Sequence, residues 1–522
     1  MKEITNRRTF AIISHPDAGK TTLTEKLLLY GNAIDLAGNV RARRNQRSTT
    51  SDWMEMERER GISITSTVLQ FSYLDYIFNL LDTPGHQDFS EDTYRTLAAV
   101  DSAVMVLDAA KGIEPQTRRL FEVCRQRGIP IFTFINKMDR PSLGPLALLD
   151  EIQNMLDMEP VPVNWPLGDG DRFKGVYDRA QKGVYIYERT ERNERIAPET
   201  FIPMDKVSAN GVFKQEQIDQ LQSDISLLDG LGMQFDQQKM LAEKQTPVFF
   251  ASALTNFGVK LFLEAFAELA PPPQPYETDQ GMVSPEDEDF SGFVFKIQAN
   301  MNPKHHDSVA FVRVCSGEFE RGMDVIHLQS GRTYRLQRSY KLFANERETI
   351  EKAYPGDVIG LPNAAGFGIG DTLYDQKAVR FKKIPRFHPE HFGAVRNLDP
   401  NKYKQFYKGL EQLETEGAVQ VFFQVDALKR EPILAVVGVL QFDVVQARLE
   451  NEYHVPTEVE RLPNAAVRWV TGEKNEILRM ADRQSVNLCT DTDDKYVALF
   501  RESFFVGYTA ENFPQLTFTK MN

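Results

Sequence analysis

The chain has 522 residues, 42% of them hydrophobic, a length that exceeds what one hydrophobic core supports and predicts about three domains. Its formal net charge of −13 argues against broad, unselective binding of nucleic acid, while a small basic patch could still contact RNA. No apolar run approaches the roughly 18 residues of a membrane span, and the first residues do not read as a signal peptide. The three cysteines lack metal-ligand spacing. We therefore expect a cytoplasmic protein with reduced thiols and no membrane contact.

The first motif is a phosphate-binding loop, S-H-P-D-A-G-K-T-T. It follows an apolar run at residues 10–13, typical of a buried parallel strand, and precedes residues 23–29, whose apolar spacing is helical. Backbone N–H groups at such a helix start can surround phosphates, Lys20 reaches the β- and γ-phosphates, and the Thr21 hydroxyl holds Mg²⁺. We expect the nucleotide to contact Ser14, His15, Pro16, Asp17, Ala18, Gly19, Lys20, Thr21 and Thr22. Ser14 replaces the usual first glycine, so this end of the loop must tolerate a Cβ; a chance glycine turn is the alternative for this segment alone.

A candidate switch segment follows. Residues 41–47 are rich in arginine and read equally well as a solvated surface loop. Ser63, in R-G-I-S-I, precedes an apparent strand at residues 68–73, and its hydroxyl can complete the Mg²⁺ shell while a γ-phosphate is present. We therefore predict Ser63 as a metal ligand. The alternative is an Arg-Gly turn of no special function, which would look similar.

The next motif, D-T-P-G-H, ends an apolar strand at residues 77–81. Asp82 at the carboxyl end of a parallel strand is placed to bind Mg²⁺ through water, and Gly85 lets its N–H approach the γ-phosphate. His86 could then orient the attacking water, which makes it the predicted catalytic residue; a surface histidine is the alternative. The nucleotide contacts expected here are Asp82, Thr83, Pro84 and Gly85.

The third motif, N-K-M-D, follows two further apolar strands at residues 104–108 and 130–135. The carboxylate of Asp139 can accept both the N1–H and the N2–H of guanine, Asn136 would accept or donate at the other edge of the purine, and the stem of Lys137 would lie along the base. A chance turn is the alternative. A last strand at residues 247–251 leads to S-A-L, whose N–H groups can meet the guanine O6. The predicted base contacts are Asn136, Lys137, Asp139, Ser252, Ala253 and Leu254, and the predicted ligands are GTP or GDP with Mg²⁺.

The rest of the chain divides by composition. We expect a phosphate-loop GTPase domain at residues 1–275, with an insertion at about 158–245 that holds a hairpin at 175–188. The proline-rich link at 270–275 leads to a β-barrel domain at 285–380, with strands at 292–298, 309–315, 323–328 and 333–339. An α+β domain at 384–522 completes the multidomain α/β and β architecture. Beyond about Arg461 we expect only a small tail on this domain.

Together, the motifs S-H-x-D-x-G-K-T-T, R-G-I-S-I, D-T-P-G-H, N-K-M-D and S-A-L resemble those of the translational GTPases. Ser63 where threonine is usual, Gln87 after His86, and D-F-S-E-D-T-Y-R-T-L resemble the bacterial class II peptide chain release factors within that group. The resemblance implies that Pro16 and Ile62 flank the catalytic histidine and that Asp17 is a candidate ligand for a monovalent cation. It also implies a second domain that meets the small ribosomal subunit and a third domain similar to that of the ribosomal translocase, whose further domains have no counterpart here.

This resemblance implies a ribosome-dependent GTPase that promotes dissociation of class I release factors after peptide release. The implied partners are the ribosome, through its RNA and proteins, and the class I factors, and we expect a monomer. One alternative is a truncated relative of the translocase. Another is a non-catalytic, GTP-gated binding protein, which an absence of multiple-turnover hydrolysis with ribosomes would favour.

Overall fold

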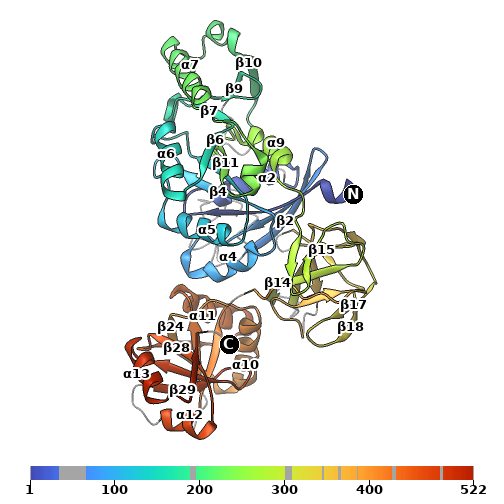
Figure 1. The fold of residues 1–522 in the computed structure, drawn as a ribbon, viewed down its shortest axis with the longest axis vertical. Helices are drawn as coiled ribbons and strands as arrows, with labels where there is room; N and C mark the ends of the chain where they lie inside the picture. The colour runs from blue at the N-terminus through green and yellow to red at the C-terminus, as the bar shows by residue number, and fades with distance from the viewer. Residues whose placement is uncertain are drawn as a thin grey trace.

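The structure is a computed structural model that describes residues 2–34, 66–188, 195–299, 308–343, 346–362, 366–384, 386–425, 431–481 and 486–520. Within these residues three large sheets follow one another along the chain (Figure 1). The first is α/β, the second is antiparallel and the third is α+β. The predicted fold class is therefore confirmed.

The first sheet contains seven described strands in the order β2-β3-β1-β4-β5-β11-β6. They are β1 (Arg7–Ser14), β2 (Thr67–Tyr73), β3 (Tyr76–Asp82), β4 (Ser102–Asp108), β5 (Ile131–Asn136), β6 (Glu159–Pro162) and β11 (Gln245–Phe250). Strand β2 is antiparallel to β3, and the other described neighbours are parallel. Strands β1 and β4 are buried along their whole length, as expected for apolar strands covered on both faces. Parallel pairing brings the carboxyl ends of β1, β3, β4, β5 and β11 to one edge, where the sequence motifs lie.

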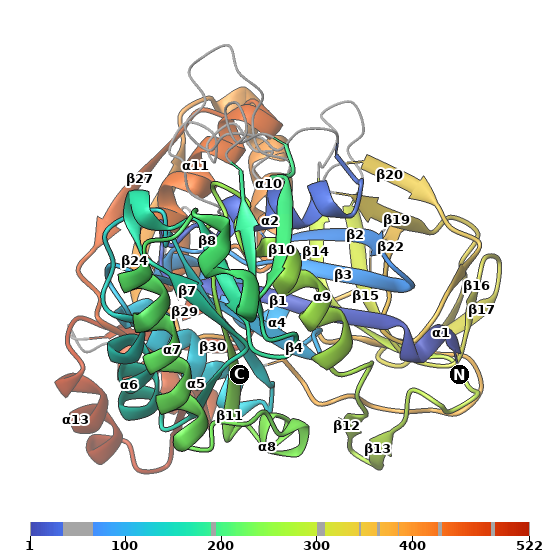
Figure 2. The ribbon, with the colours of Figure 1, turned by 90° about the horizontal axis from the view of Figure 1, so that it is seen from above.

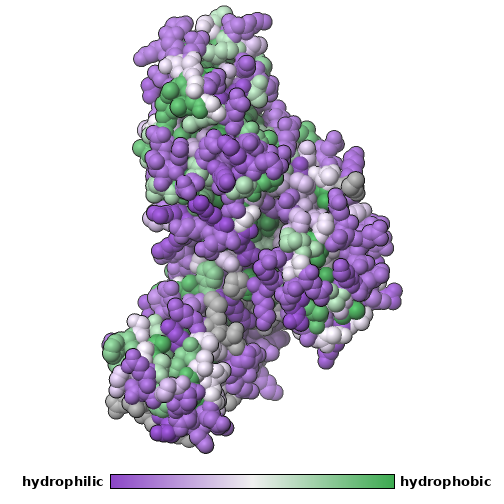
Figure 3. Space-filling model, in the orientation of Figure 1, coloured by the Kyte–Doolittle hydropathy of each residue, from purple (hydrophilic) through white to green (hydrophobic). Residues whose placement is uncertain are grey.

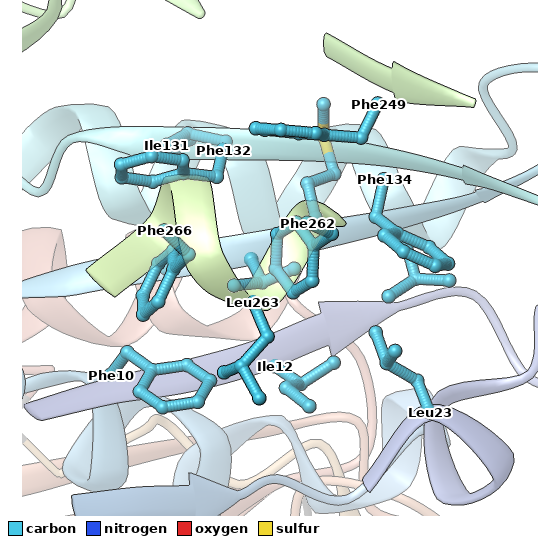
Figure 4. Close-up of a cluster of buried hydrophobic side chains, with 14 of the residues drawn as sticks. Phe10, Ile12, Leu23, Ile131, Phe132, Phe134, Phe249, Phe262, Leu263 and Phe266 are labelled. Carbon is cyan, nitrogen blue, oxygen red and sulfur yellow. The ribbon is translucent and has the colours of Figure 1, made fainter. Parts of the chain in front are cut away.

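Helices cover this sheet on both sides (Figure 1). They are α1 (Lys2–Thr5), α2 (Lys20–Tyr30), α4 (Ser90–Leu97), α5 (Pro115–Gln126), α6 (Pro145–Leu156) and α9 (Val259–Leu269). Figure 4 shows how α9 closes the core: the ring of Phe266 lies 4.7 Å from those of Phe10 and Phe132, and Phe262 lies 5.0 Å from Phe134. Burying such rings contributes roughly 1.5–3 kcal/mol each, so α9 is held by apolar burial rather than by polar contacts.

The insertion forms a small sheet of its own in the order β10-β9-β8-β7, at the top of Figure 1. Its elements are β7 (Asn164–Leu167), β8 (Gly175–Asp178), β9 (Gly183–Tyr187), β10 (Glu199–Pro203) and α7 (Gln215–Gly230), followed by α8 (Gln237–Leu241). The predicted hairpin is confirmed as β8 and β9. The indole N–H of the buried Trp165 donates to Asp224 at 3.0 Å, which ties α7 to β7.

The second sheet is antiparallel and barrel-like, in the order β18-β17-β23-β14-β15-β22-β19-β20. Its strands are β14 (Ser291–Ala299), β15 (Ser308–Ser316), β17 (Asp324–His327), β18 (Arg332–Arg335), β19 (Tyr340–Phe343), β20 (Glu346–Thr349), β22 (Val358–Pro362) and β23 (Thr372–Tyr374). Short pairs β12 (Tyr276–Thr278) with β13 (Gly281–Val283), and β16 (Phe319–Glu320) with β21 (Lys352–Ala353), accompany it. The strand predicted at 333–339 was too long, because its pairing with β17 ends at Arg335.

A buried polar interface joins this sheet to the first. Arg313 of β15 and Asp101, just before β4, form an ion pair of 2.6 Å with both side chains buried. Burial lowers the pKa of the Arg313 guanidinium, but the adjacent carboxylate more than offsets this and raises it. Burial also raises the pKa of Asp101, against the lowering effect of Arg313. Arg313, Thr9 and Asn79 all donate to the carbonyl of Gly356. Strand β19 also lies beside β2 (Figure 2).

The third sheet contains eight described strands in the order β27-β24-β26-β25-β29-β30-β28-β31. Its first half is β24 (His391–Asn397), α10 (Tyr403–Thr415), β25 (Gln420–Gln424), β26 (Pro432–Val436), α11 (Leu440–Tyr453) and β27 (Thr457–Leu462). Its second half is β28 (Ala466–Thr471), α12 (Lys474–Ala481), β29 (Val486–Thr490), β30 (Tyr496–Phe500), α13 (Phe504–Asn512) and β31 (Thr517–Thr519). The two halves repeat the same β-α-β-β-α-β order.

The expectation of a small tail beyond about Arg461 was therefore wrong. Residues 466–519 supply four of the eight strands and two helices, and a separate apolar cluster that includes Ile477, Met480 and Phe500 holds them. The segment was underestimated because its strands are three to six residues long and its helices eight and nine, lengths at which apolar periodicity is a weak signal.

The visible surface is mostly hydrophilic, with hydrophobic residues in small scattered groups (Figure 3). None of the helices in the described parts of the chain has the length and apolar character that crossing a bilayer requires.

The third sheet contains one carboxyl group with a strongly shifted pKa. Burial raises the pKa of Glu414, near the end of α10, from its usual 4.5 to about 7, against the lowering effects of the Val421 N–H and of Arg386. The folded protein then binds a proton that the unfolded chain has lost, so stability should fall as pH rises from about 4.5 to about 7. We predict that Glu414→Gln removes this fall and raises the free energy of unfolding at about pH 8 by on the order of 1 kcal/mol.

Urea unfolding at about pH 5 and about pH 8 measures this difference. Glu411→Gln, an exposed neighbour on the same helix, is the matched control and should follow the wild type. An equal pH dependence in the Glu414→Gln variant and the wild type would contradict the assignment.

Candidate active site

The phosphate loop lies between β1 and α2 at the carboxyl edge of the first sheet. Ser14 ends β1 and is buried, so the Cβ at this position is accommodated inside the sheet. Asp17 and Gly19 have positive φ angles of 67° and 103°, which turn the chain sharply into α2. The nine predicted contacts, residues 14–22, thus form one continuous turn from the strand into the first turn of the helix.

Two predicted groups, one at the start of α2 and one at the end of β3, meet at this loop. The amine of Lys20 lies 2.6 Å from a carboxylate oxygen of Asp82, with both side chains buried. Parallel pairing of β1 with β3 places Ile12 opposite Asp82, and the Thr83 hydroxyl donates to the Ile12 carbonyl at 2.7 Å. The Thr21 hydroxyl and the Asp82 carboxylate are hard oxygen donors of the kind that Mg²⁺ takes. Ser63 and Ile62, with the arginine-rich residues 41–47, lie outside the described residues.

Asn136, at the end of β5, connects three segments of the site. Its amide nitrogen donates to the Ala18 carbonyl at 2.8 Å, and its amide oxygen accepts the N–H groups of Lys137 at 2.8 Å and of Ala253 at 2.9 Å. A Cβ at Gly19 would overlap the Asn136 amide. The expectation that Asn136 accepts or donates at the purine narrows to donation, because both lone pairs of its oxygen are used.

The side chain of Lys137 reaches the phosphate loop. Its amine contacts the carbonyl of Asp17 and lies 2.8 Å from a carboxylate oxygen of Asp108. Burial raises the pKa of Asp108, but the hydrogen bond from Lys137 and the N–H of Ala110 outweigh it, so the pKa lies below its usual value. Asp108 is not among the residues predicted from the sequence, although it shares with Asp82 the signal of an acidic residue at the carboxyl end of a parallel strand.

The predicted base contacts come from the loops after β5 and β11. The Ser252 hydroxyl donates to one carboxylate oxygen of Asp139 at 2.6 Å, and Ser252 is itself fully buried. That contact fixes the plane of the Asp139 carboxylate, whose oxygens retain lone pairs for further donors. Ala253 is buried against Asn136, whereas Leu254 is 42% exposed, so within S-A-L only the leucine side chain faces outward.

His86 follows Pro84 and Gly85 in the loop after β3. Its Nδ1 lies 3.2 Å from the N–H of Asp88 and 3.3 Å from a carboxylate oxygen of Asp88, and its side chain is partly exposed. A Cβ at Gly85 would lie 3.8 Å from the Cα of Pro16, so this loop passes directly beside the phosphate loop. The structure thus gathers every predicted site residue in its described part along one edge of the sheet.

Comparison with known proteins places this site in a family. The model of the elongation factor Tu GTP binding domain matches residues 5–272. The chain is 57% identical over 517 residues to peptide chain release factor 3 of Gloeobacter violaceus, covering 99% of this chain and 97% of that protein, and 55% identical over 513 residues to that of Rippkaea orientalis, covering 98% and 95%. This chain belongs to the peptide chain release factor 3 family.

Two further matches agree with membership of the release factor 3 family. The model of the class II release factor RF3 C-terminal domain matches residues 381–510, and that of elongation factor G domain 2 matches residues 289–376. A crystal structure of a protein from Thermus thermophilus superposes with a TM-score of 0.70 over 91% of this chain and 71% of that chain. At 23% identity, this likeness shows the fold alone.

In this release factor 3 site, Gly19 is the position least able to accept a side chain. We predict that Gly19→Ala lowers the free energy of unfolding by about 2 kcal/mol, because alanine resists a positive φ and its Cβ displaces Asn136. Guanine nucleotide affinity should fall at least about tenfold, the factor that corresponds to roughly 1.4 kcal/mol. Denaturant unfolding and isothermal titration with GDP measure both effects.

Gly230→Ala is the matched control, since Gly230 ends α7 with open space around its Cβ. It should leave both quantities unchanged within about 0.5 kcal/mol. A Gly19→Ala variant as stable and as avid as this control would contradict the role given to Asn136.

Proposed function

We propose that this chain is a ribosome-stimulated GTP hydrolase that promotes dissociation of class I release factors after peptide release. Membership of the release factor 3 family, with its GTP binding domain, already makes it a GTPase of translation termination. The observation that carries the finer proposal is the joint arrangement of the phosphate loop, D-T-P-G-H and N-K-M-D at one edge of the first sheet, where Asp88, two residues after His86, also contacts α11. Nucleotide state can act on ribosomal states only if the GTP and GDP forms differ in affinity for them, and this contact offers a route by which the third domain would respond.

The proposed nucleotide contacts divide by chemistry. Asp139 reads the guanine N1–H and N2–H, the free N–H of Asn136 and the backbone of residues 252–254 meet its other edge, and the Lys137 stem lies along the base. The backbone of residues 14–22 and the Lys20 amine hold the phosphates, with residues 83–85 beside the γ-phosphate. Lys20 and Asp82, which pair at 2.6 Å, would separate to face phosphate and metal respectively.

The metal ligands we propose are Thr21, Ser63 and Asp82. Bound Mg²⁺ would neutralise charge on the β- and γ-phosphate oxygens. His86 is the proposed catalytic residue: its ring orients the attacking water, with Pro16 and Ile62 on either side. Asp17 is proposed as a ligand for a monovalent cation. Its carbonyl already meets the ammonium of Lys137, which leaves the exposed carboxylate for this role.

The proposed domains are 1–275, with the insertion at about 158–245, then 285–380 and 384–522. The sheet boundaries and the family matches at residues 5–272, 289–376 and 381–510 support them. We further propose a cytoplasmic monomer whose partners are ribosomal RNA and proteins and the class I factors.

Guanine selectivity tests the base site. We predict that Asp139→Asn weakens GTP binding by roughly tenfold to hundredfold and improves binding of xanthosine triphosphate, since the loss of buried charge-assisted pairing costs about 1–3 kcal/mol. Competition of the two nucleotides for the variant measures the ratio. Asp150→Asn on the exposed face of α6 is the control; unchanged GTP preference in Asp139→Asn would remove Asp139 from the base site.

The proposed activity is tested on post-termination ribosomes that carry a labelled class I release factor. With GTP, the protein should accelerate loss of the label and should not move transfer RNA and messenger on pre-translocation ribosomes. His86→Ala should bind GTP normally but turn it over at least roughly 10²-fold more slowly on ribosomes, the usual scale for a proton- or water-positioning group. Codon-by-codon translocation without release-factor loss would overturn the function, and wild-type turnover by His86→Ala would overturn its catalytic role.

A further inference from the structure

The segment that carries His86 contacts the third sheet at the start of one of its helices. A carboxylate oxygen of Asp88 accepts the N–H of Leu440, the first residue of α11, at 2.7 Å. The N–H groups of Val437 and Gly438, just before the helix, donate to the side chain of Gln441 at 2.8 and 2.9 Å. Asp88 accepts one of the first N–H groups of α11 and so acts as a helix cap supplied from another part of the chain.

The same segment also contacts a second helix, α10, at its C-terminal end. Two turns after Asp88, the guanidinium of Arg95 in α4 donates to the carbonyls of Glu416 and Gly417, at 3.3 and 3.2 Å, just after the end of α10. Glu91, one turn earlier in α4, forms an ion pair with Arg95 and keeps the guanidinium in place. In Figure 1, α4 lies at the boundary that faces α10 and α11.

The signs of these two contacts follow the helix dipoles. A carboxylate stands at the positive N-terminus of α11, and a guanidinium stands at the negative C-terminus of α10. Each contact thus adds charge–dipole attraction to a hydrogen bond, and the two poles lie on one surface because α10 and α11 pack against each other. Residues 88–95 therefore match the two helix ends in one orientation only, with Asp88 at the N-terminus of α11 and Arg95 at the C-terminus of α10.

Each of these two contacts needs its own glycine in the third domain. A Cβ at Gly438 would overlap the Asp88 side chain, and a Cβ at Gly417 would overlap the Arg95 guanidinium. Between the two poles, Phe89 is buried against Val444 and Leu440 of α11 in an apolar cluster of its own. Polar and apolar contacts therefore hold the segment close to the two helices.

Asp88 connects this docking to the catalytic histidine. Its N–H and one carboxylate oxygen lie 3.2 and 3.3 Å from Nδ1 of His86, while its other carboxylate oxygen holds Leu440. The ring of Phe89 also lies 6.3 Å from the His86 ring, edge to face. The backbone N–H of Asp88 thus donates to His86, while its buried carboxylate accepts from α11.

We propose that α10 and α11 position His86 through Asp88, so that GTP hydrolysis depends on whether these helices are docked on residues 88–95. Asp88 is a positioning residue, and the third domain is coupled to the GTPase site through the contacts at the two helix ends. The inference rests on the proposed catalytic role of His86. It adds the element that regulates this site and the residues through which it acts.

The test measures ribosome-stimulated GTP hydrolysis by the full chain, with kcat separated from the KM for ribosomes. Asp88→Ala and Gly438→Ala should each lower kcat about fivefold, the factor that corresponds to loss of one helix cap, with the KM unchanged within about twofold. Asp88→Asn should lie between Asp88→Ala and the wild type, because its amide oxygen can still accept the Leu440 N–H without the charge. The combined Asp88→Ala and Gly438→Ala variant should be no slower than either single variant, since both remove the same contact.

Two controls separate positioning from loss of stability. Gly507→Ala places a Cβ in open space on α13, and Glu450→Gln removes an exposed acidic side chain from the later turns of α11; both should hydrolyse GTP at the wild-type rate. A rise in KM at constant kcat, an unchanged or higher kcat, or additive losses in the combined variant would each overturn the inference. His86→Ala is measured in parallel: if it is slow while the Asp88 and Gly438 variants are normal, this inference fails alone, and if it is normal, the catalytic assignment itself fails.

Discussion

The nucleotide site depends on a single buried amide. The Asn136 amide oxygen accepts the N–H groups of Lys137 and Ala253, and its amide nitrogen donates to the carbonyl of Ala18. The phosphate loop and the loops after β5 and β11 are therefore joined by one side chain. A buried polar group with this many partners is rigid, because losing any of them leaves a desolvated donor or acceptor. The same constraint requires glycine at position 19, since only a residue without a Cβ lets the phosphate loop pass over the Asn136 amide.

The rest of the molecule is attached to this site in two different ways. The second sheet meets the first mainly through buried charges and the shared carbonyl of Gly356. The third sheet's unit meets the residues that follow His86, through contacts at the ends of α10 and α11. Helix caps contribute on the order of 1 kcal/mol each. The buried ion pair is much more costly to disrupt.

The comparisons separate fold from function. Likeness at 23% identity and a TM-score of 0.70 shows an arrangement of sheets that many chemistries could use. Identity of 57% over nearly the whole chain shows a family, and the geometry then says how its motifs cooperate in this chain. Asp108, paired with Lys137 beside the phosphate loop, is one such residue that motif reading overlooked and that the structure places at the site.

Sequence alone determined the order of the motif-bearing strands in the first domain, because these strands are continuous apolar runs and the motifs follow their carboxyl ends. The motifs also predicted a guanine-nucleotide site, since that chemistry depends on local residue types. Only the tertiary structure showed that the residues after Arg461 build half of an eight-stranded sheet, and that Asn136 joins three loops. It alone brought Asp88 and Arg95 to helices more than 300 residues away. Such contacts leave no periodic signal along the chain, because each is one hydrogen bond between segments whose own local patterns would be the same without it.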